Sequence, residues 1–255
     1  MLLALDIGNT NIVAGVSDEG VWKYQWRIQS DDSKTADEYG VLLQNLFTAE
    51  GLSYKKFDRI IIGSVVPQLT EVISEVFRRR AQTEAVVLNS TLDTGVKITT
   101  TSPKAVGADL IAGVAGACEM FEDDCIVVDF GTATTLVAVK KPGELVGGAI
   151  CAGLKVTIDA LVGKAAQLSQ IPLVPPPNVI GKNTQESMQS GLVLGHLCMV
   201  EGLIDRMKEQ LDSPTVKVVA TGGFSEKIGP YTDYFDTIDP MLTLDGLRII
   251  MDRQE

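Results

Sequence analysis

The chain has 255 residues, an apolar share of 45% and a formal net charge of −11. Its length allows one large domain or two domains of about 100–150 residues, and its acidity argues against nucleic acid or an anionic membrane as a partner. No apolar run approaches the roughly 20 residues of a membrane span, and the N-terminus lacks the basic flank of a signal peptide. Because the four cysteines show no paired spacing, we expect reduced thiols in a cytoplasmic protein.

The chain begins with two apolar runs that flank a turn of small polar residues. This pattern predicts a β-hairpin whose tip carries Asp6, Gly8, Asn9 and Thr10. Gly8 lets a ligand approach the backbone, and Asn9, Thr10 and the loop N–H groups can donate to phosphate oxygens. Asp6 is placed to hold a metal ion, directly or through water. Taken alone, the turn is also typical of an ordinary hairpin, in which Asp and Asn are common.

The rest of the first half predicts alternating strands and helices. Strands are expected over 2–7, 12–17, 21–28, 59–63 and 85–89, and helices over 35–51, over 69–77 and after Pro103. Thr35 and Glu38 form a capping box at the start of the first helix, and Gly51 ends it.

Asp109 lies near the start of the helix that follows Pro103. One interpretation is a first-turn acid that complements the helix dipole. Beside a phosphate-binding turn, however, the same carboxylate is a candidate general base for an acceptor hydroxyl. Both interpretations remain open at this point.

The second half of the chain repeats the first hairpin. Residues 125–137 again give an apolar strand, Asp129, a glycine, Thr132 and a second apolar strand. A chain that repeats one supersecondary unit per half has duplicated a domain. Two such acidic, hydroxyl-lined tips facing across a cleft would hold a nucleotide triphosphate and its metal. We therefore predict two α/β domains, residues 1–118 and 119–255.

Further segments of the second half carry candidate features. Strands are expected over 125–129, 133–140, 144–150 and 216–220, and helices over 154–166 and 183–211. Gly191 and Gly195 would allow a second backbone to pack closely, either at an intrachain helix crossing or at a subunit interface. His196, the only histidine, is expected to be packed or at an interface. The turn containing Gly222 and Gly223 is either the floor of an adenosine site or a plain strand–helix turn.

In order along the chain, these segments resemble the type III pantothenate kinases, which belong to the actin/hexokinase/Hsp70-like ATPase superfamily. The matching segments are Asp6–Thr10, Ser64–Pro67, Pro103–Asp109, Asp129–Thr135, Gly147–Ile150, Gly181–Thr184, Thr221–Gly223 and Asp239–Leu247. The resemblance covers most of the chain. It implies two duplicated ribonuclease H-like (actin-like ATPase) domains, each a mixed sheet flanked by helices, with an inter-domain cleft.

The resemblance also implies a role for each matching residue. The groups expected to bind ATP and Mg²⁺ are Asp6, Gly8, Asn9, Thr10, Thr132, Gly222 and Gly223. Asp129 would bind an activating K⁺ or NH₄⁺. Asp109 would take or orient the proton of the primary hydroxyl of pantothenate, with Gly107 and Ala108 beside it. Thr184 would reach the substrate of a neighbouring subunit, so that a dimer is part of the site.

The acceptor side departs from the family pattern. The family's Arg after the catalytic acid is Leu110 here, a Tyr is missing from 97–101, and Ala152 replaces a Pro. Loss of a charge-assisted bond to a buried anion costs roughly 1.5–3 kcal/mol or more.

Three hypotheses follow from these departures. The chain is a homodimeric kinase that compensates with other donors, or one subunit of a hetero-oligomer whose paralogous partner supplies the missing contacts. In the third hypothesis it is a relative that phosphorylates another hydroxyl, only hydrolyses ATP or is non-catalytic. We favour the first because Asp6, Asp109 and Asp129 are all present.

Overall fold

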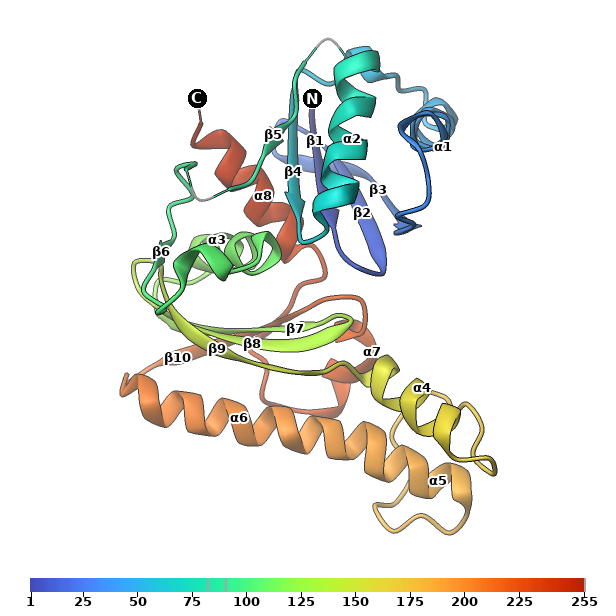
Figure 1. The fold of residues 1–255 in the computed structure, drawn as a ribbon. Coiled ribbons are helices and arrows are strands. Elements are labelled where there is room, and N and C mark those ends of the chain that lie inside the picture. Colours follow the sequence, from blue (N-terminus) through green and yellow to red (C-terminus); the bar gives the residue numbers. More distant parts are fainter. Residues whose placement is uncertain (82, 90, 255) are drawn as a thin grey trace. The chain divides into compact units, whose positions relative to one another are not determined.

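The computed structural model describes residues 1–81, 83–89 and 91–254 (Figure 1). The chain forms two compact units. Unit 1 contains Met1–Val96, Ser102–Gly116 and the residues from Thr243 onward, and unit 2 contains Lys97–Thr101 and Ala117–Leu242. Neither unit is therefore a continuous stretch of sequence.

Unit 1 is built on a mixed five-stranded sheet with the order β3-β2-β1-β4-β5. Its strands are β1 (Leu2–Ile7), β2 (Asn11–Asp18), β3 (Val21–Gln29), β4 (Arg59–Ser64) and β5 (Val86–Val87). β1, β2 and β3 form an antiparallel meander, and β4 and β5 extend the sheet parallel to β1. The predicted strands are confirmed, although β5 is shorter than the predicted 85–89.

Helices cover both faces of this sheet. They are α1 (Ala36–Ala49), α2 (Pro67–Arg80), the first part of α3 (Ala108–Met120) and α8 (Leu242–Asp252), with 3₁₀ turns at Tyr54–Lys56 and Pro103–Ala105. The predicted capping box of α1 is confirmed, since Thr35 and Glu38 each bond the other's backbone N–H. Gly51, with φ +69°, ends the helix in the left-handed conformation that a residue without a Cβ adopts readily.

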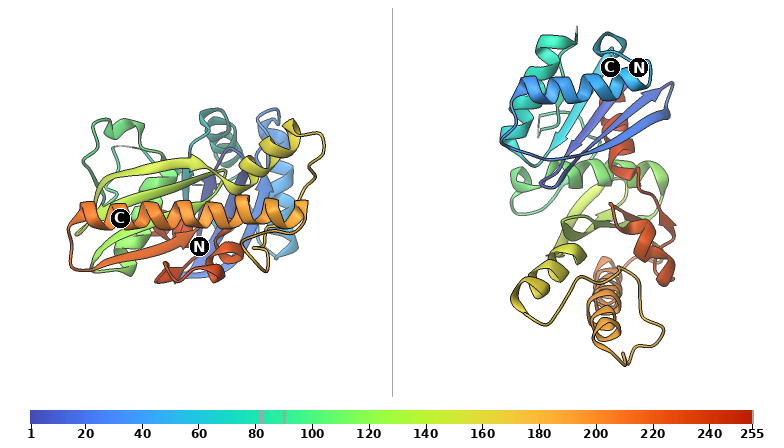
Figure 2. Two further views of the ribbon diagram at one scale, coloured as in Figure 1. Left: turned by 90° about the horizontal axis from the view of Figure 1, so that it is seen from below. Right: turned by 90° about the vertical axis from the view of Figure 1, so that its right-hand side faces the viewer.

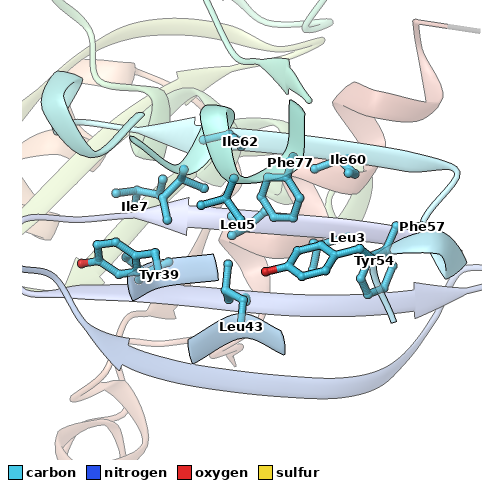
Figure 3. Close-up of a cluster of buried hydrophobic side chains, with 14 of the residues drawn as sticks. Leu3, Leu5, Ile7, Tyr39, Leu43, Tyr54, Phe57, Ile60, Ile62 and Phe77 are labelled. Atoms are coloured by element: carbon cyan, nitrogen blue, oxygen red, sulfur yellow. The ribbon is translucent and has the colours of Figure 1, made fainter. Parts of the chain in front are cut away.

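The core of unit 1 lies between the sheet and helices α1 and α2. Leu3, Leu5 and Ile7 of β1 are fully buried beside Tyr39 and Leu43 of α1, as Figure 3 shows. Three consecutive odd positions of the strand thus face one core, as the two-residue period of a strand requires. This packing fixes β1 in register and so fixes where the turn after Ile7 begins.

Helices α3 and α8 pack at the opposite face of the same sheet. A Cβ added at Gly63 of β4 would lie 2.9 Å from the side chain of Leu247. A Cβ added at Gly246 would lie 1.7 Å from the carbonyl oxygen of Ala112, so the backbones of α8 and α3 touch. The last helix of the chain therefore completes the first unit.

Unit 2 repeats this topology in a six-stranded sheet with the order β11-β10-β7-β8-β9-β6. Its strands are β6 (Lys97–Ile98), β7 (Asp124–Phe130), β8 (Ala133–Lys140), β9 (Glu144–Ala152), β10 (Val216–Thr221) and β11 (Thr237–Ile238). The order β9-β8-β7-β10-β11 matches β3-β2-β1-β4-β5, with the same strand directions. Even the register shift recurs, between Val16 and Ser17 in β2 and between Ala138 and Val139 in β8. The repetition predicted from the two hairpins thus extends to whole sheets.

The helices of unit 2 are α4 (Leu154–Lys164), α5 (Thr184–Met188), α6 (Gly195–Leu211) and α7 (Ser225–Ile228), with a 3₁₀ turn at Gly229–Tyr231. Helix α6 runs across one face of the sheet (Figures 1 and 2) and buries Leu197, Val200 and Ile204. The prediction of one continuous α-helix over 183–211 is wrong in one detail, because Gln189–Leu194 forms a π-helical turn. Gln189 is buried there and its Nε2 donates to the carbonyl of Pro172 at 3.3 Å.

The structure tests the predictions made for Gly191, Gly195 and His196, which lie on α6 and the π-helical turn before it. A Cβ added at Gly191 would meet no described atom within 4 Å, and one at Gly195 would meet only the Ser190 carbonyl, at 3.8 Å. The prediction of a close intrachain helix crossing at these glycines is therefore wrong, whereas a subunit interface at them stays a prediction. His196 is buried, lies against the ring of Phe130 and is 3.0 Å from Thr134 Oγ1, which confirms that it is packed.

None of the described helices is both long enough and apolar enough to span a bilayer. All four cysteines are free thiols, as predicted: Cys118, Cys125, Cys151 and Cys198.

Candidate active site

The turn between β1 and β2 presents the first group of predicted site residues. Asp6 is the penultimate residue of β1 and pairs with Gly63 of β4 in the parallel register. The N–H of Gly8 donates to the carbonyl of Asn11 at 2.9 Å and closes the turn. Asn9 and Thr10 at its tip are exposed. The structure therefore brings Asp6, Gly8, Asn9 and Thr10 into one turn.

Asp109 lies at the same edge of this sheet. The N–H of Val65, just after β4, donates to the carbonyl of Ile7 at 3.1 Å, so the ends of β1 and β4 lie together. A Cβ added at Gly107 would lie 3.2 Å from Val65 and 2.3 Å from Asp109 Oδ1. Gly107 thus lets the start of α3 approach the strand ends. Asp109 and the turn that carries Asp6 share one edge of unit 1.

The environment of Asp109 increases the affinity of its carboxylate for a proton. The side chain is partly buried, and burial raises the pKa of Asp109 above its usual value because a carboxylate loses hydration there. The N–H of Leu110 donates to Asp109 Oδ1 at 2.8 Å, which lowers the pKa by a smaller amount and holds the carboxyl group in place. A fixed carboxylate with a raised pKa is suited to accept a proton.

A second group of predicted residues meets at the corresponding edge of unit 2. Asp129 of β7 pairs with Thr221 of β10, and the N–H of Gly131 closes the next turn onto Ala133 at 3.0 Å. A Cβ added at Gly222 would lie 2.1 Å from Asp129 Oδ1, and Gly222 has φ +90°.

No side chain fits at Gly222, so this turn packs directly against Asp129. Thr132 and Gly223 are exposed in the same region. The structure therefore brings Asp129, Thr132, Gly222 and Gly223 together.

Asp239 is a residue of this edge that sequence reasoning did not assign to the site. The N–H of Asp239 donates to the carbonyl of Ala220 at 2.8 Å, and Ile238 pairs with Ala220. Asp239 therefore follows β11 at the level of Thr221, two strands away from Asp129. An acid directly after a short apolar segment was the available signal. It was missed because β11 has only two residues and shows no measurable periodicity.

Thr184 lies apart from these groups within its own unit. It begins the short helix α5, which Figure 1 shows away from β7 and β10. Asn183 caps this helix through its Oδ1, which accepts the N–H of Glu186 at 2.9 Å. Thr184 is exposed. The chain by itself does not join Thr184 to Asp129.

Carboxylates are the predicted metal ligands, and their number limits the kind of metal site. Among residues 1–81, 83–89 and 91–254, no three His, Cys, Asp or Glu side chains are grouped to hold a metal ion. Mg²⁺ needs no such cage, since it is commonly bound by one or two carboxylates together with substrate phosphates and water. A single carboxylate such as Asp6 suits this kind of site and not a structural zinc site.

Comparison with known proteins defines the class and the family. Among solved structures, a Baf family protein of Campylobacter jejuni described as a transcriptional activator has a TM-score of 0.65 at 18% identity, over 99% of this chain and 98% of that chain. A protein of Sinorhizobium meliloti, described as a candidate 2-dehydro-3-deoxygalactonokinase, has a TM-score of 0.63 at 12% identity, over 98% and 95%. These solved structures thus share the predicted α/β fold of this chain.

Sequence similarity is more specific than this structural likeness. The family model described as type III pantothenate kinase matches residues 2–206. A type III pantothenate kinase of Moorella thermoacetica is 44% identical over 253 residues, which cover 99% of this chain and 99% of the relative. The chain belongs to the type III pantothenate kinase family.

Proposed function

We propose that this chain transfers the γ-phosphoryl group of ATP to the primary hydroxyl of pantothenate, the first step of coenzyme A biosynthesis. The observation that carries the proposal is the placement of Asp109. Its raised pKa and fixed carboxyl group occur at the same sheet edge as the turn with Asp6, in a chain of this kinase family. We expect the reaction to take place in the cytoplasm.

The ATP-binding groups are proposed residue by residue. Asp6, Gly8, Asn9 and Thr10 would hold phosphates and Mg²⁺, since exposed hydroxyl, amide and backbone donors suit phosphate oxygens. When bound, Mg²⁺ neutralises the charge of the phosphate chain.

The second turn is proposed to complete nucleotide binding. Thr132 would contact the phosphates, while Gly222 and Gly223 would contact the adenosine. The absence of a side chain at Gly222, where a Cβ would overlap Asp129, supports a close backbone approach in this region.

Asp109 is proposed to receive the hydroxyl proton of pantothenate. Phosphoryl transfer passes through a loose transition state, so aligning the hydroxyl oxygen contributes more than removing its proton early. The bond from Leu110 N–H to Oδ1 supports this function because it holds the carboxyl group in one orientation. Gly107 and Ala108 would border the substrate at the start of α3.

A dimer is proposed as the working unit, with Thr184 acting on the substrate of the neighbouring subunit. Gly191, Gly195 and Cys198 form an exposed strip of small residues on one face of the π turn and α6, which supports a close helix contact between subunits.

Mixing two defective variants tests this arrangement. Asp109→Asn and Thr184→Ala each damage the site, but a dimer of one with the other contains one complete site if Thr184 acts across the interface. Random pairing then restores about a quarter of the wild-type sites. No gain of activity on mixing would refute the action of Thr184 in trans.

Asp129 is proposed to bind the activating monovalent cation, K⁺ or NH₄⁺. Its carboxylate is a suitable oxygen ligand for a hard cation. We expect activity in KCl or NH₄Cl to exceed activity in NaCl, and Asp129→Asn to remove the difference. Equal activity of the wild type in all three salts would refute this assignment.

Release of ADP by the purified chain, with and without pantothenate, tests the reaction itself. Pantothenate-dependent release supports the proposal. Release only after addition of a paralogous chain would instead indicate a hetero-oligomer whose partner supplies the contact that Leu110 cannot make. Release without pantothenate would indicate hydrolysis or another acceptor.

A further inference from the structure

In unit 1, Ser30 forms hydrogen bonds to two backbone carbonyl groups of the turn between β1 and β2. Asn11 and Gln29 are the last pair of the β2–β3 ladder, and Ser30 follows directly. The N–H of Ser30 donates to the carbonyl of Thr10 at 2.9 Å, and its Oγ donates to the carbonyl of Gly8 at 2.6 Å. A single residue therefore binds two carbonyl oxygens of the turn.

The equivalent position in unit 2 is Gly153. Ala133 and Ala152 end the β8–β9 ladder as Asn11 and Gln29 end the other. The N–H of Gly153 donates to the carbonyl of Thr132 at 3.1 Å. A Cβ added at Gly153 would lie 2.2 Å from that oxygen and 2.6 Å from the carbonyl oxygen of Gly131.

In each unit a glycine carbonyl and the threonine carbonyl of the turn thus face this position, two residues apart in unit 1 (Gly8 and Thr10) and consecutive in unit 2 (Gly131 and Thr132).

Glycine is required at position 153 because neighbouring atoms leave no room for a side chain, and not because of its backbone conformation. Gly153 has φ −66° and ψ 157°, a conformation that any residue adopts. The turn carbonyls instead approach its Cα so closely that no side chain fits. Unit 1 leaves room for a side chain, and the hydroxyl of Ser30 fills it as a donor. The two units thus share the N–H bond to the threonine carbonyl, and unit 1 adds a hydroxyl bond to the glycine carbonyl.

We propose that Ser30 and Gly153 are positioning residues that orient the peptide groups of the two turns toward ATP. In a trans peptide the C=O and N–H point in opposite directions. Holding the Gly8 carbonyl toward Ser30 therefore turns the N–H of Asn9 to the other side of the turn. The inference rests on the proposed function of these turns in binding phosphate.

Ser30 provides a test with matched controls. Ser30→Ala removes one hydrogen bond to the turn and should raise the KM and Kd for Mg·ATP about threefold to tenfold, the loss expected for one neutral bond. The kcat and the KM for pantothenate should not change. Ser30→Thr keeps the hydroxyl and should restore ATP affinity. Ser33→Ala should bind like the wild type, because the Ser33 hydroxyl bonds only Asp31, at 2.6 Å, in the same loop.

Gly153 provides a second test. Gly153→Ala should weaken ATP binding more than Ser30→Ala, because the new methyl group must displace the turn. Gly163→Ala is its control on the neighbouring helix α4, where an added Cβ would meet no described atom within 4 Å. Thermal unfolding identifies the folded variants, and Ser30→Ala decides the question if Gly153→Ala does not fold.

Calorimetric titration with Mg·ATP separates this inference from the proposed reaction. Weaker binding by Ser30→Ala, with wild-type binding by Ser33→Ala, supports the inference even if the wild type shows no pantothenate-dependent turnover. The inference is overturned if Ser30→Ala binds ATP as the wild type does, or if Ser33→Ala is equally impaired.

Discussion

Replacing Asp109 by Asn tests the proposed catalytic residue with little structural disturbance. Asn has the same shape, and its amide oxygen can accept the Leu110 N–H that now bonds Oδ1 at 2.8 Å. What the variant loses is the negative charge and the ability to accept a proton. The helix α3 and the edge contact at Gly107 should be unaffected.

The magnitude follows from the function assigned to the carboxylate. General-base catalysis contributes about 10²–10⁴ in rate, which is about 2.7–5.4 kcal/mol of barrier at 1.36 kcal/mol per tenfold. Because the transition state is loose and Asn still accepts a hydrogen bond, we expect the lower end, about a hundredfold in kcat. The KM for ATP should change little, since the phosphate turn is intact.

Stability should move in the opposite direction to activity. Burial raises the pKa of Asp109 in the folded chain above its unfolded value of 3.8. Such a group favours the folded state at low pH, and this advantage is lost as the pH rises through the raised pKa. The amide of Asp109→Asn does not ionise, so the variant should be at least as stable as the wild type at neutral pH and less dependent on pH. Thermal unfolding between pH 4 and 8 measures this.

A coupled ADP-release assay with pantothenate measures the loss of turnover. Glu119→Gln is the matched control, because Glu119 is an exposed acid on the same helix. It should keep wild-type activity. A kcat for Asp109→Asn within a few-fold of the wild type would refute the assignment of Asp109 as the base.

Three further predictions concern binding, pH dependence and the core. Gly222→Ala should raise the KM for ATP at least about tenfold, as measured by steady-state kinetics. The added Cβ would overlap Asp129, and a positive φ costs a residue other than glycine about 1–2 kcal/mol. Burial lowers the pKa of His196 below 6.5. As the pH decreases below about 6.5, the imidazole is therefore protonated more readily in the unfolded chain than in the folded chain, and the free energy of unfolding falls. His196→Gln, which can still bond Thr134, should flatten this dependence in urea unfolding between pH 5 and 7.5. Phe47→Ala should destabilise the folded chain by about 3–5 kcal/mol in urea, because Phe47 is fully buried among aromatic rings.

Each of these expectations has a contrary outcome. A wild-type KM for ATP in Gly222→Ala would show that this turn does not border the nucleotide. An equal fall in stability below pH 6.5 in His196→Gln and the wild type would assign the effect to other groups. A loss below about 1 kcal/mol in Phe47→Ala would mean that the core relaxes around the cavity.

The sequence alone determined the local features of this protein. The two turns with Asp6 and Asp129, the capping box at Thr35 and most strands were predictable, because turn chemistry and side-chain periodicity act over a few residues. The repetition of the hairpin also predicted that the sheets would share one topology. These signals located the candidate phosphate-binding residues before any tertiary contact was known.

Only the tertiary structure decided which distant segments meet. Nothing local in the sequence places α8 against the sheet of unit 1, aligns Asp239 with Thr221, or brings Ser30 onto the carbonyl of Gly8. The two-residue strand β11 and the π-helical turn at Gln189–Leu194 have no periodic pattern of their own. Such features depend on shape complementarity and hydrogen bonding between surfaces far apart in the chain, so they emerge only when the whole fold is assembled.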